Sequence, residues 1–156
     1  MNEYIPIISS VTALLAVIIG PFITLYIAKR QIKANVLSPN RQNWIHILRD
    51  EISNYLAITA RTGSATASRT EDQSYIMCCI EDLSRSESKI RLLLNPIEPD
   101  HQDLISLLKK TSSSVWYLHA NNKGNFAEDL NTLREDIIKI AQPILKKEWV
   151  RVKKLE

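Results

Sequence analysis

The pattern of apolar and polar positions divides the chain into two unlike parts. No charged residue occurs from Ile5 to Ala28, whereas charged and polar residues are frequent in the remainder. This uncharged stretch of 24 positions forms a helix roughly 36 Å long, which is enough to cross a hydrocarbon core of about 30 Å. It therefore predicts a transmembrane helix, within a first segment of residues 1–35 that includes a short juxtamembrane extension.

The charged residues beside this stretch predict its orientation. Glu3 precedes it, and Lys29, Arg30 and Lys33 follow it. A secretory signal peptide has a basic residue before its apolar stretch and a small-residue cleavage site after it, so the arrangement favours a retained single span. Because basic residues beside a span stay in the cytoplasm, we expect the N-terminus outside and the rest inside. The three cations are expected to contact lipid head groups.

Small and hydroxylic residues follow one another along the predicted span at steps of four, three, four and four, which places them on one helical face. This small-residue stripe consists of Ser9, Ala13, Ala16, Gly20 and Thr24. Small residues let transmembrane helices approach closely, so the stripe predicts a homo-oligomer, for which a ring around a pore is one arrangement. The alternative is that the small residues only give room to Pro21, which removes a helical hydrogen bond.

Residues 36–156 carry four amphipathic patterns, in which apolar residues recur every three or four positions, as on one face of a helix. Apolar positions of the four patterns include Ile45, Leu48, Ile52 and Tyr55; Ile76, Cys79, Leu83 and Ile90; Leu104, Leu108 and Val115; and Leu130, Leu133, Ile137 and Ile144. Short connections between such helices favour an antiparallel bundle. The predicted fold class is all-α, with one N-terminal transmembrane helix followed by a cytoplasmic antiparallel bundle of about four helices.

Helix boundaries are predicted from capping residues and prolines. Ser38-Pro39 is expected to end the first helix and to start the next one, with Ser38 as its N-cap. The small and polar residues of 62–70 predict a loop. Asp100 is expected to be the N-cap of the third bundle helix, and Pro143 is expected to bend the fourth.

An antiparallel bundle of four helices returns its C-terminus to the membrane, and the C-terminal residues are basic. The predicted contacts with anionic lipid head groups are made by Lys146, Lys147, Arg151, Lys153 and Lys154, with Trp149 among them. The alternative is a solvated helix end whose cations suit the helix dipole. Nucleic acid can bind the same kind of patch, although a net charge of +3 does not require it.

Composition removes the commonest metal, nucleotide and redox sites. The chain has only 3 Gly and 2 Cys, and it contains no CxxC, HExxH or Gly-rich phosphate loop. The adjacent Cys78 and Cys79 are unsuited to a structural disulfide in the cytoplasm, and Cys79 fits the core. The cluster of Asp100, His101 and Asp103 fits the first turn of a helix better than a metal site. We therefore expect no metal and no cofactor.

One pair of residues fits a catalytic pattern. Arg41 and His46 are separated by four residues at the start of the first bundle helix. In metal-independent HEPN RNases an R-x(4–6)-H pair acts across a dimer, with His as acid and base and Arg stabilising the charge that develops on phosphorus. The alternative is structural: His46 pairs with Asp50 one turn later, and Arg41 contacts head groups or a neighbouring subunit.

The predicted span, the basic residues after it and the Arg41–His46 motif at the head of a helical bundle together resemble a known family. The chain is similar to the small transmembrane accessory proteins of type VI-B CRISPR systems. The resemblance implies a HEPN-like bundle in a bacterial inner-membrane multimer. It also implies a functional partner, the RNA-guided RNase, beside which the multimer perturbs the membrane to strengthen antiphage defence.

Three hypotheses about function follow. In the first, the protein is an oligomeric pore or membrane-perturbing effector, and Arg41 and His46 hold its cytoplasmic ring together. In the second, it is a membrane-anchored RNase, so that replacing His46 abolishes cleavage but not assembly. In the third, it is an anchored interaction module without enzymatic activity, for which neither residue matters.

Overall fold

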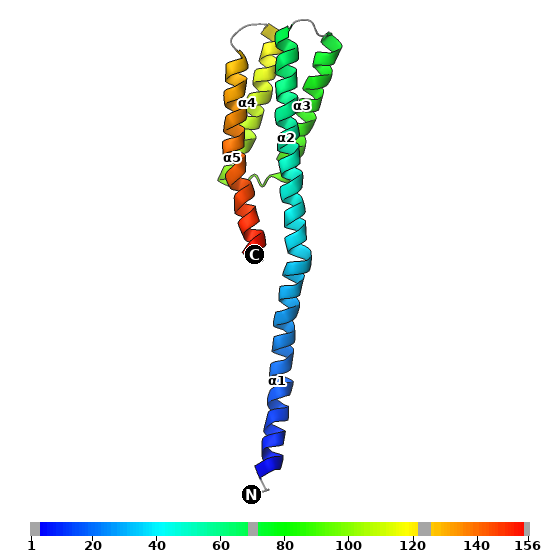
Figure 1. The fold of residues 1–156 in the computed structure, drawn as a ribbon, viewed down its shortest axis with the longest axis vertical. Helices are drawn as coiled ribbons and strands as arrows, with labels where there is room; N and C mark the ends of the chain where they lie inside the picture. The colour runs from blue at the N-terminus through cyan, green and yellow to red at the C-terminus, as the bar shows by residue number, and fades with distance from the viewer. Residues whose placement is uncertain (1–3, 69–71, 122–125, 155–156) are drawn as a thin grey trace.

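The computed structural model describes residues 4–68, 72–121 and 126–154, and every regular element within these ranges is a helix (Figure 1). The elements are α1 (Tyr4–Ile32), the π-helical turn η1 (Lys33–Leu37), α2 (Ser38–Ser68), α3 (Gln73–Leu93), α4 (Pro99–Asn121) and α5 (Phe126–Lys154). The all-α prediction is confirmed for this part of the chain.

The molecule consists of a helical bundle from which one long helix projects (Figure 1). Helices α2 to α5 form the bundle, with α2 against α3 and α5, and α4 between its neighbours α3 and α5. Successive helices run in opposite directions, so the predicted antiparallel four-helix bundle is confirmed. The C-terminal end of α5 extends past the α3–α4 connection and lies beside the start of α2.

The predicted break at Ser38-Pro39 is wrong, because the helix continues through it. Ser38 has helical dihedral angles (φ −65°, ψ −49°), and its N–H donates to the Lys33 carbonyl oxygen. This i→i−5 bond is that of a π turn, which shifts the hydrogen-bond register just before Pro39. The wider turn accommodates a proline that has no N–H and would clash with a carbonyl in a regular α-helix. The predicted segment boundary, between residues 35 and 36, consequently lies inside an unbroken helix.

The predicted loop over residues 62–70 is also wrong for its first seven residues, because α2 extends to Ser68. Thr62 is fully buried and its hydroxyl donates to the Ile58 carbonyl oxygen at 2.8 Å. A Cβ placed on Gly63 would lie 3.6 Å from the Leu130 side chain, so α5 packs directly against this turn. The small residues serve close helix packing here, and tertiary contact outweighs their low helix propensity. Residues 69–70 lie outside the described ranges.

The start of α4 differs slightly from expectation. The helix begins at Pro99, so Asp100 lies in its first turn and is not the N-cap. Proline is well suited to a first helical position, where its missing N–H costs nothing. Pro143 lies inside α5 as expected, and the last third of that helix leans toward α2.

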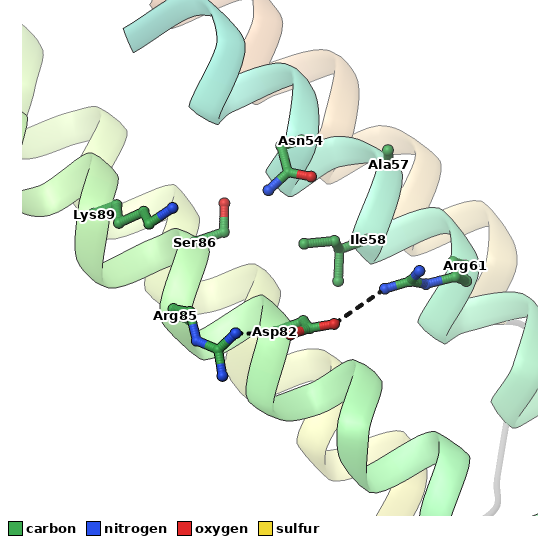
Figure 2. Close-up of a pocket in the computed structure, with 8 residues that line it drawn as sticks. All are labelled: Asn54, Ala57, Ile58, Arg61, Asp82, Arg85, Ser86 and Lys89. Carbon is green, nitrogen blue, oxygen red and sulfur yellow. Dashed lines mark hydrogen bonds and ion pairs between the residues drawn. The ribbon is translucent and has the colours of Figure 1, made fainter. Parts of the chain in front are cut away.

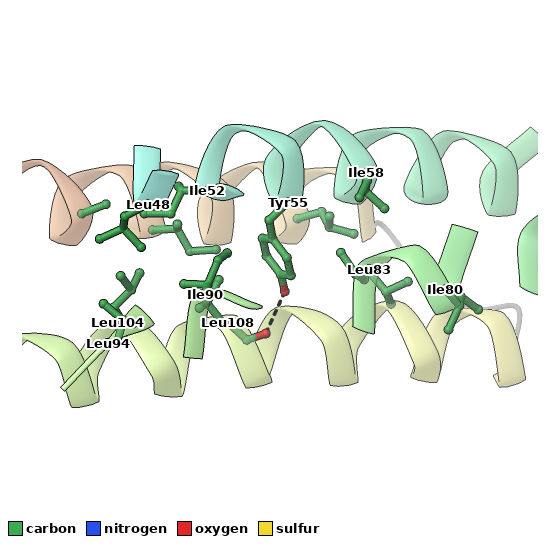
Figure 3. Close-up of a cluster of buried hydrophobic side chains, with 14 of the residues drawn as sticks. Leu48, Ile52, Tyr55, Ile58, Ile80, Leu83, Ile90, Leu94, Leu104 and Leu108 are labelled. Carbon is green, nitrogen blue, oxygen red and sulfur yellow. Dashed lines mark hydrogen bonds between the residues drawn. The ribbon is translucent and has the colours of Figure 1, made fainter. Parts of the chain in front are cut away.

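The bundle core is continuous and contains one fully buried tyrosine (Figure 3). The Tyr55 hydroxyl donates to the Leu108 carbonyl oxygen at 2.8 Å and lies 2.9 Å from the Ser112 hydroxyl, which donates to it. Burial raises the pKa of Tyr55 well above its usual value near 10. The neutral phenol therefore connects α2 to α4 inside the core.

We expect Tyr55→Phe to lower the free energy of unfolding by about 1–3 kcal/mol, because it leaves the two buried oxygen partners without their hydrogen bond. The measurement is thermal or denaturant unfolding of the full chain in mild detergent. Tyr26→Phe, in the projecting part of α1, is the matched control and should change the value by less than about 0.5 kcal/mol. Equal effects of the two substitutions would contradict this role of Tyr55.

Candidate functional site

Helix α1 exposes nearly all of its large apolar side chains. Val17, Phe22 and Tyr26 are exposed by 73%, 71% and 67%, and none of the most apolar stretch of this helix is buried. By length and composition, this is a helix able to cross a membrane. Soluble proteins rarely leave such a large contiguous apolar surface uncovered, so α1 needs a lipid or protein environment that the bundle does not supply.

The small-residue stripe lies on this uncovered helix. Ser9, Ala13, Ala16 and Thr24 are exposed, and Gly20 is partly exposed. A Cβ added to Gly20 would meet no atom within 4 Å, so the space beside the stripe is open. The Thr24 hydroxyl donates to the Gly20 carbonyl oxygen at 2.9 Å, one turn back. The stripe therefore presents a shallow backbone face that a second helix can approach.

The three cations after the apolar stretch are exposed. Lys29 and Arg30 end α1, and Lys33 begins η1. In the chain they lie between the apolar stretch and the bundle, and among the described residues α3, α4 and α5 make no contact with α1 or η1. Their placement agrees with a basic collar at one end of α1.

Arg41 connects α2 to α5 at the base of the bundle, the end from which α1 projects. Its Nε lies 3.2 Å from Oε2 of Glu148 on α5, and the Glu148 side chain is only 11% exposed. The other Glu148 oxygen accepts from Arg151, one turn later on α5. Two guanidinium groups thus hold one largely buried carboxylate, which ties α5 to the lower end of α2.

His46 does not share this environment. It is exposed on α2, whereas Arg41 is turned toward α5. Five residues along a helix correspond to about 140° of rotation, so the two side chains leave the helix in different directions. None of the ion pairs among the described residues joins His46 to Asp50. A single chain therefore does not present Arg41 and His46 to one substrate.

A second cluster at the same end of the bundle was not predicted from the sequence. The Trp44 indole N–H donates to the Leu93 carbonyl oxygen at 2.9 Å, and its ring stacks on His101 with centroids 6.3 Å apart. His101 is buried, and its Nδ1 accepts the Asn95 backbone N–H at 2.9 Å. This imidazole holds the α3–α4 connection against α2. Within the described residues no group of three or more His, Cys, Asp or Glu could hold a metal ion.

The basic residues near the end of α5 have two kinds of environment. Lys147 lies 3.0 Å from Glu98 and 3.8 Å from Asp100, and its ammonium group lowers the pKa of Glu98. Arg151 is engaged by Glu148. Lys146, Lys153 and Lys154 are exposed, and none of the ion pairs among the described residues includes them. Of the five α5 cations predicted to contact lipid, two therefore have carboxylate partners within the chain.

An open groove of about 400 Å³ lies between α2 and α3 (Figure 2). Arg61 and Arg85 both approach Asp82, at 3.4 and 3.3 Å, and Lys89 lies 3.1 Å from Glu51. The groove thus pairs its three cations with two carboxylates. The Arg61–Asp82 and Lys89–Glu51 pairs connect α2 to α3, whereas the Arg85–Asp82 pair lies within α3.

No protein-family model, curated protein or solved structure matches the chain.

Arg41 and His46 should differ in their effect on stability. We expect Arg41→Ala to lower the free energy of unfolding by about 1 kcal/mol, because the ion pair with Glu148 is lost. His46→Ala, at an exposed position, should change it by less than about 0.5 kcal/mol. Thermal unfolding of the full chain in detergent measures both, and Arg41→Glu/Glu148→Arg should recover part of the loss. A larger effect at His46 than at Arg41 would refute this assignment.

Proposed function

We propose that this protein is a membrane-anchored homo-oligomer that perturbs the bilayer or forms a pore in it. In this proposal α1 crosses a bacterial inner membrane with its N-terminus outside, and the bundle stands in the cytoplasm. The small-residue stripe packs the spans of neighbouring chains against one another.

The observation that carries the proposal is that none of the most apolar stretch of α1 is buried, together with the open space beside the stripe at Gly20. Lipid covers an apolar helix but does not require a face of Gly, Ala and Ser. Contact between copies of α1 would use that face, and the remaining Ile, Leu and Val side chains would contact lipid. The exposed basic collar of Lys29, Arg30 and Lys33 supports a cytoplasmic bundle by the positive-inside rule.

The cellular role proposed for this assembly comes from the resemblance to type VI-B CRISPR accessory proteins. We propose that the assembly acts beside the RNA-guided RNase of such a system and increases membrane permeability during antiphage defence. The α-helical bundle, with the Arg41–His46 motif at its head, is compatible with a divergent HEPN-like module.

Nuclease activity is the less favoured function. It requires Arg41 of one chain and His46 of another to face a common phosphate, because they diverge within one chain. Arg41 would also have to leave Glu148, its partner at 3.2 Å. A structural role for Arg41, at the joint between α2 and α5, agrees better with this contact. An anchored interaction module without permeability is the remaining alternative.

The mass of the detergent-solubilised full chain tests assembly. We expect a discrete oligomer by multi-angle light scattering or native mass spectrometry. Ala16→Leu/Gly20→Leu should shift it toward monomer, because bulk on the stripe holds the helices apart. Ser10→Leu/Ala28→Leu adds side-chain bulk on the same helix outside the stripe and should leave the mass unchanged. A monomeric wild type, or a stripe variant of unchanged mass, would refute the proposed assembly.

Permeability is tested separately by ion efflux from proteoliposomes containing the full chain. We expect wild-type protein to release ions, and the stripe variant to release several-fold less at equal protein density, because the pore needs an intact oligomer. His46→Ala should leave efflux intact, because this proposal assigns assembly to the stripe and no longer to Arg41 and His46. An oligomer without efflux supports the interaction module instead, and loss of labelled-RNA cleavage in His46→Ala would support the nuclease.

A further inference from the structure

The last turns of α5 present a basic and aromatic surface that the bundle does not use. The outward-facing residues of these turns, which we call the α5 tail face, are Lys146, Trp149, Val150, Lys153 and Lys154. The residues between them are either packed against the bundle or paired with its carboxylates. Trp149 is 43% exposed, and the Lys153 ammonium group lies 5.6 Å from the centre of its ring.

The lysines of the tail face differ from their basic neighbours on α5. Lys147 and Arg151 are committed to Glu98 and Glu148, as described above. Among the ion pairs found in the described part of the chain, none includes Lys146, Lys153 or Lys154. Their positive charges remain available to an external anion.

The position of the tail face follows from the contact between Arg41 and Glu148, which fixes α5 against α2. Arg41 lies 13 residues beyond Ala28, the last residue of the uncharged stretch, which is about 20 Å along a helix. Lys154 lies 6 residues beyond Glu148, about 9 Å back in the opposite direction. The end of α5 is therefore about 10 Å from the level of Ala28 along the rod. Figure 1 shows α5 ending beside the rod, past the α3–α4 connection.

A bilayer has a polar layer of about 5–8 Å on each side of its hydrocarbon core. Lysine side chains at about 10 Å from the core edge are flexible enough to extend into that layer. Tryptophan and lysine are also the residues enriched where proteins meet the membrane interface. Lys33 lies five residues beyond Ala28, about 8 Å along the rod, and so at a similar level.

We propose that the α5 tail face binds the anionic head groups of the bilayer that α1 crosses, and so fixes the bundle against the membrane surface. This inference rests on the proposed insertion of α1 and adds a second lipid contact to it. The head-group contact is thereby assigned to Lys146, Lys153 and Lys154 with Trp149, and not to Lys147 or Arg151. RNA phosphates would offer the same charge, but the apolar Trp149 and Val150 and the proximity to the membrane favour lipid.

Tryptophan quenching in proteoliposomes tests this contact with the full chain. The probe is a phospholipid with a nitroxide on its head group, mixed into vesicles of phosphatidylcholine with phosphatidylglycerol. The chain has 3 Trp, and we expect about one third of the emission to be quenchable, with that fraction lost in Trp149→Phe. In vesicles of phosphatidylcholine alone, the quenched fraction should fall at least twofold.

Two matched variants separate a specific contact from general charge attraction. Lys153→Glu/Lys154→Glu should reduce the quenched fraction at least twofold, whereas Lys109→Glu/Lys110→Glu, with the same charge change on exposed positions of α4, should leave it unchanged. Equal effects of the two variants, or quenching unaffected by Trp149→Phe, would overturn the inference. Loss of quenching on addition of an RNA oligonucleotide would overturn it in favour of a nucleic-acid surface.

Insertion of α1 is scored independently in the same vesicles by resistance to alkaline carbonate extraction. Inserted protein without Trp149 quenching refutes the tail contact and leaves the proposed function standing. Protein that carbonate extracts refutes the proposed function and the tail contact together.

Discussion

The continuity of the helix through Pro39 is the constraint on which the rest of the structure depends. The π turn at η1 lets α1 and α2 form one rod, although the sequence places a proline in its middle. A flexible hinge at this point would leave the bundle free to take any position relative to α1. With the rod intact, the exposed apolar helix and the packed bundle have one fixed geometry, and the base of the bundle lies a definite distance from the basic collar.

This geometry gives the Arg41–Glu148 contact its importance. The contact lies where α5 returns beside the start of α2, and it fixes α5 to α2 at that end of the bundle. At the same end of the bundle, Trp44 and His101 form hydrogen bonds with Leu93 and Asn95 and so hold the α3–α4 connection in place. Three of the four bundle helices are therefore fixed to α2 near the end that faces α1.

Periodicity predicted the helices and their core well. Leu48, Ile90, Leu104 and Ile137 are all fully buried, as their spacing indicates. Local signals at helix ends were less informative, because tertiary contacts outweighed them. Pro39 does not end the helix, because a π turn precedes it. Gly63 stays helical, because α5 packs against it through Leu130.

The candidate site was predictable only in part. The exposed stripe and the basic collar depend on spacing along one helix, which a sequence displays directly. The Arg41–Glu148 and Trp44–His101 contacts join residues distant in the chain, and periodicity carries no information on such pairs. The Arg41–His46 motif has the right spacing in sequence, but the helix turns its two side chains in different directions.

The central claim is that copies of α1 meet through the small-residue stripe within a membrane. Disulfide cross-linking in native membranes tests it most directly, using single cysteines placed along residues 9–24 of a full chain that carries Cys78→Ser/Cys79→Ala. The account predicts that cross-linking peaks at positions 9, 13, 16, 20 and 24 and is weak between them. A flat profile, or a maximum on the opposite face at positions such as 11 and 18, would contradict it.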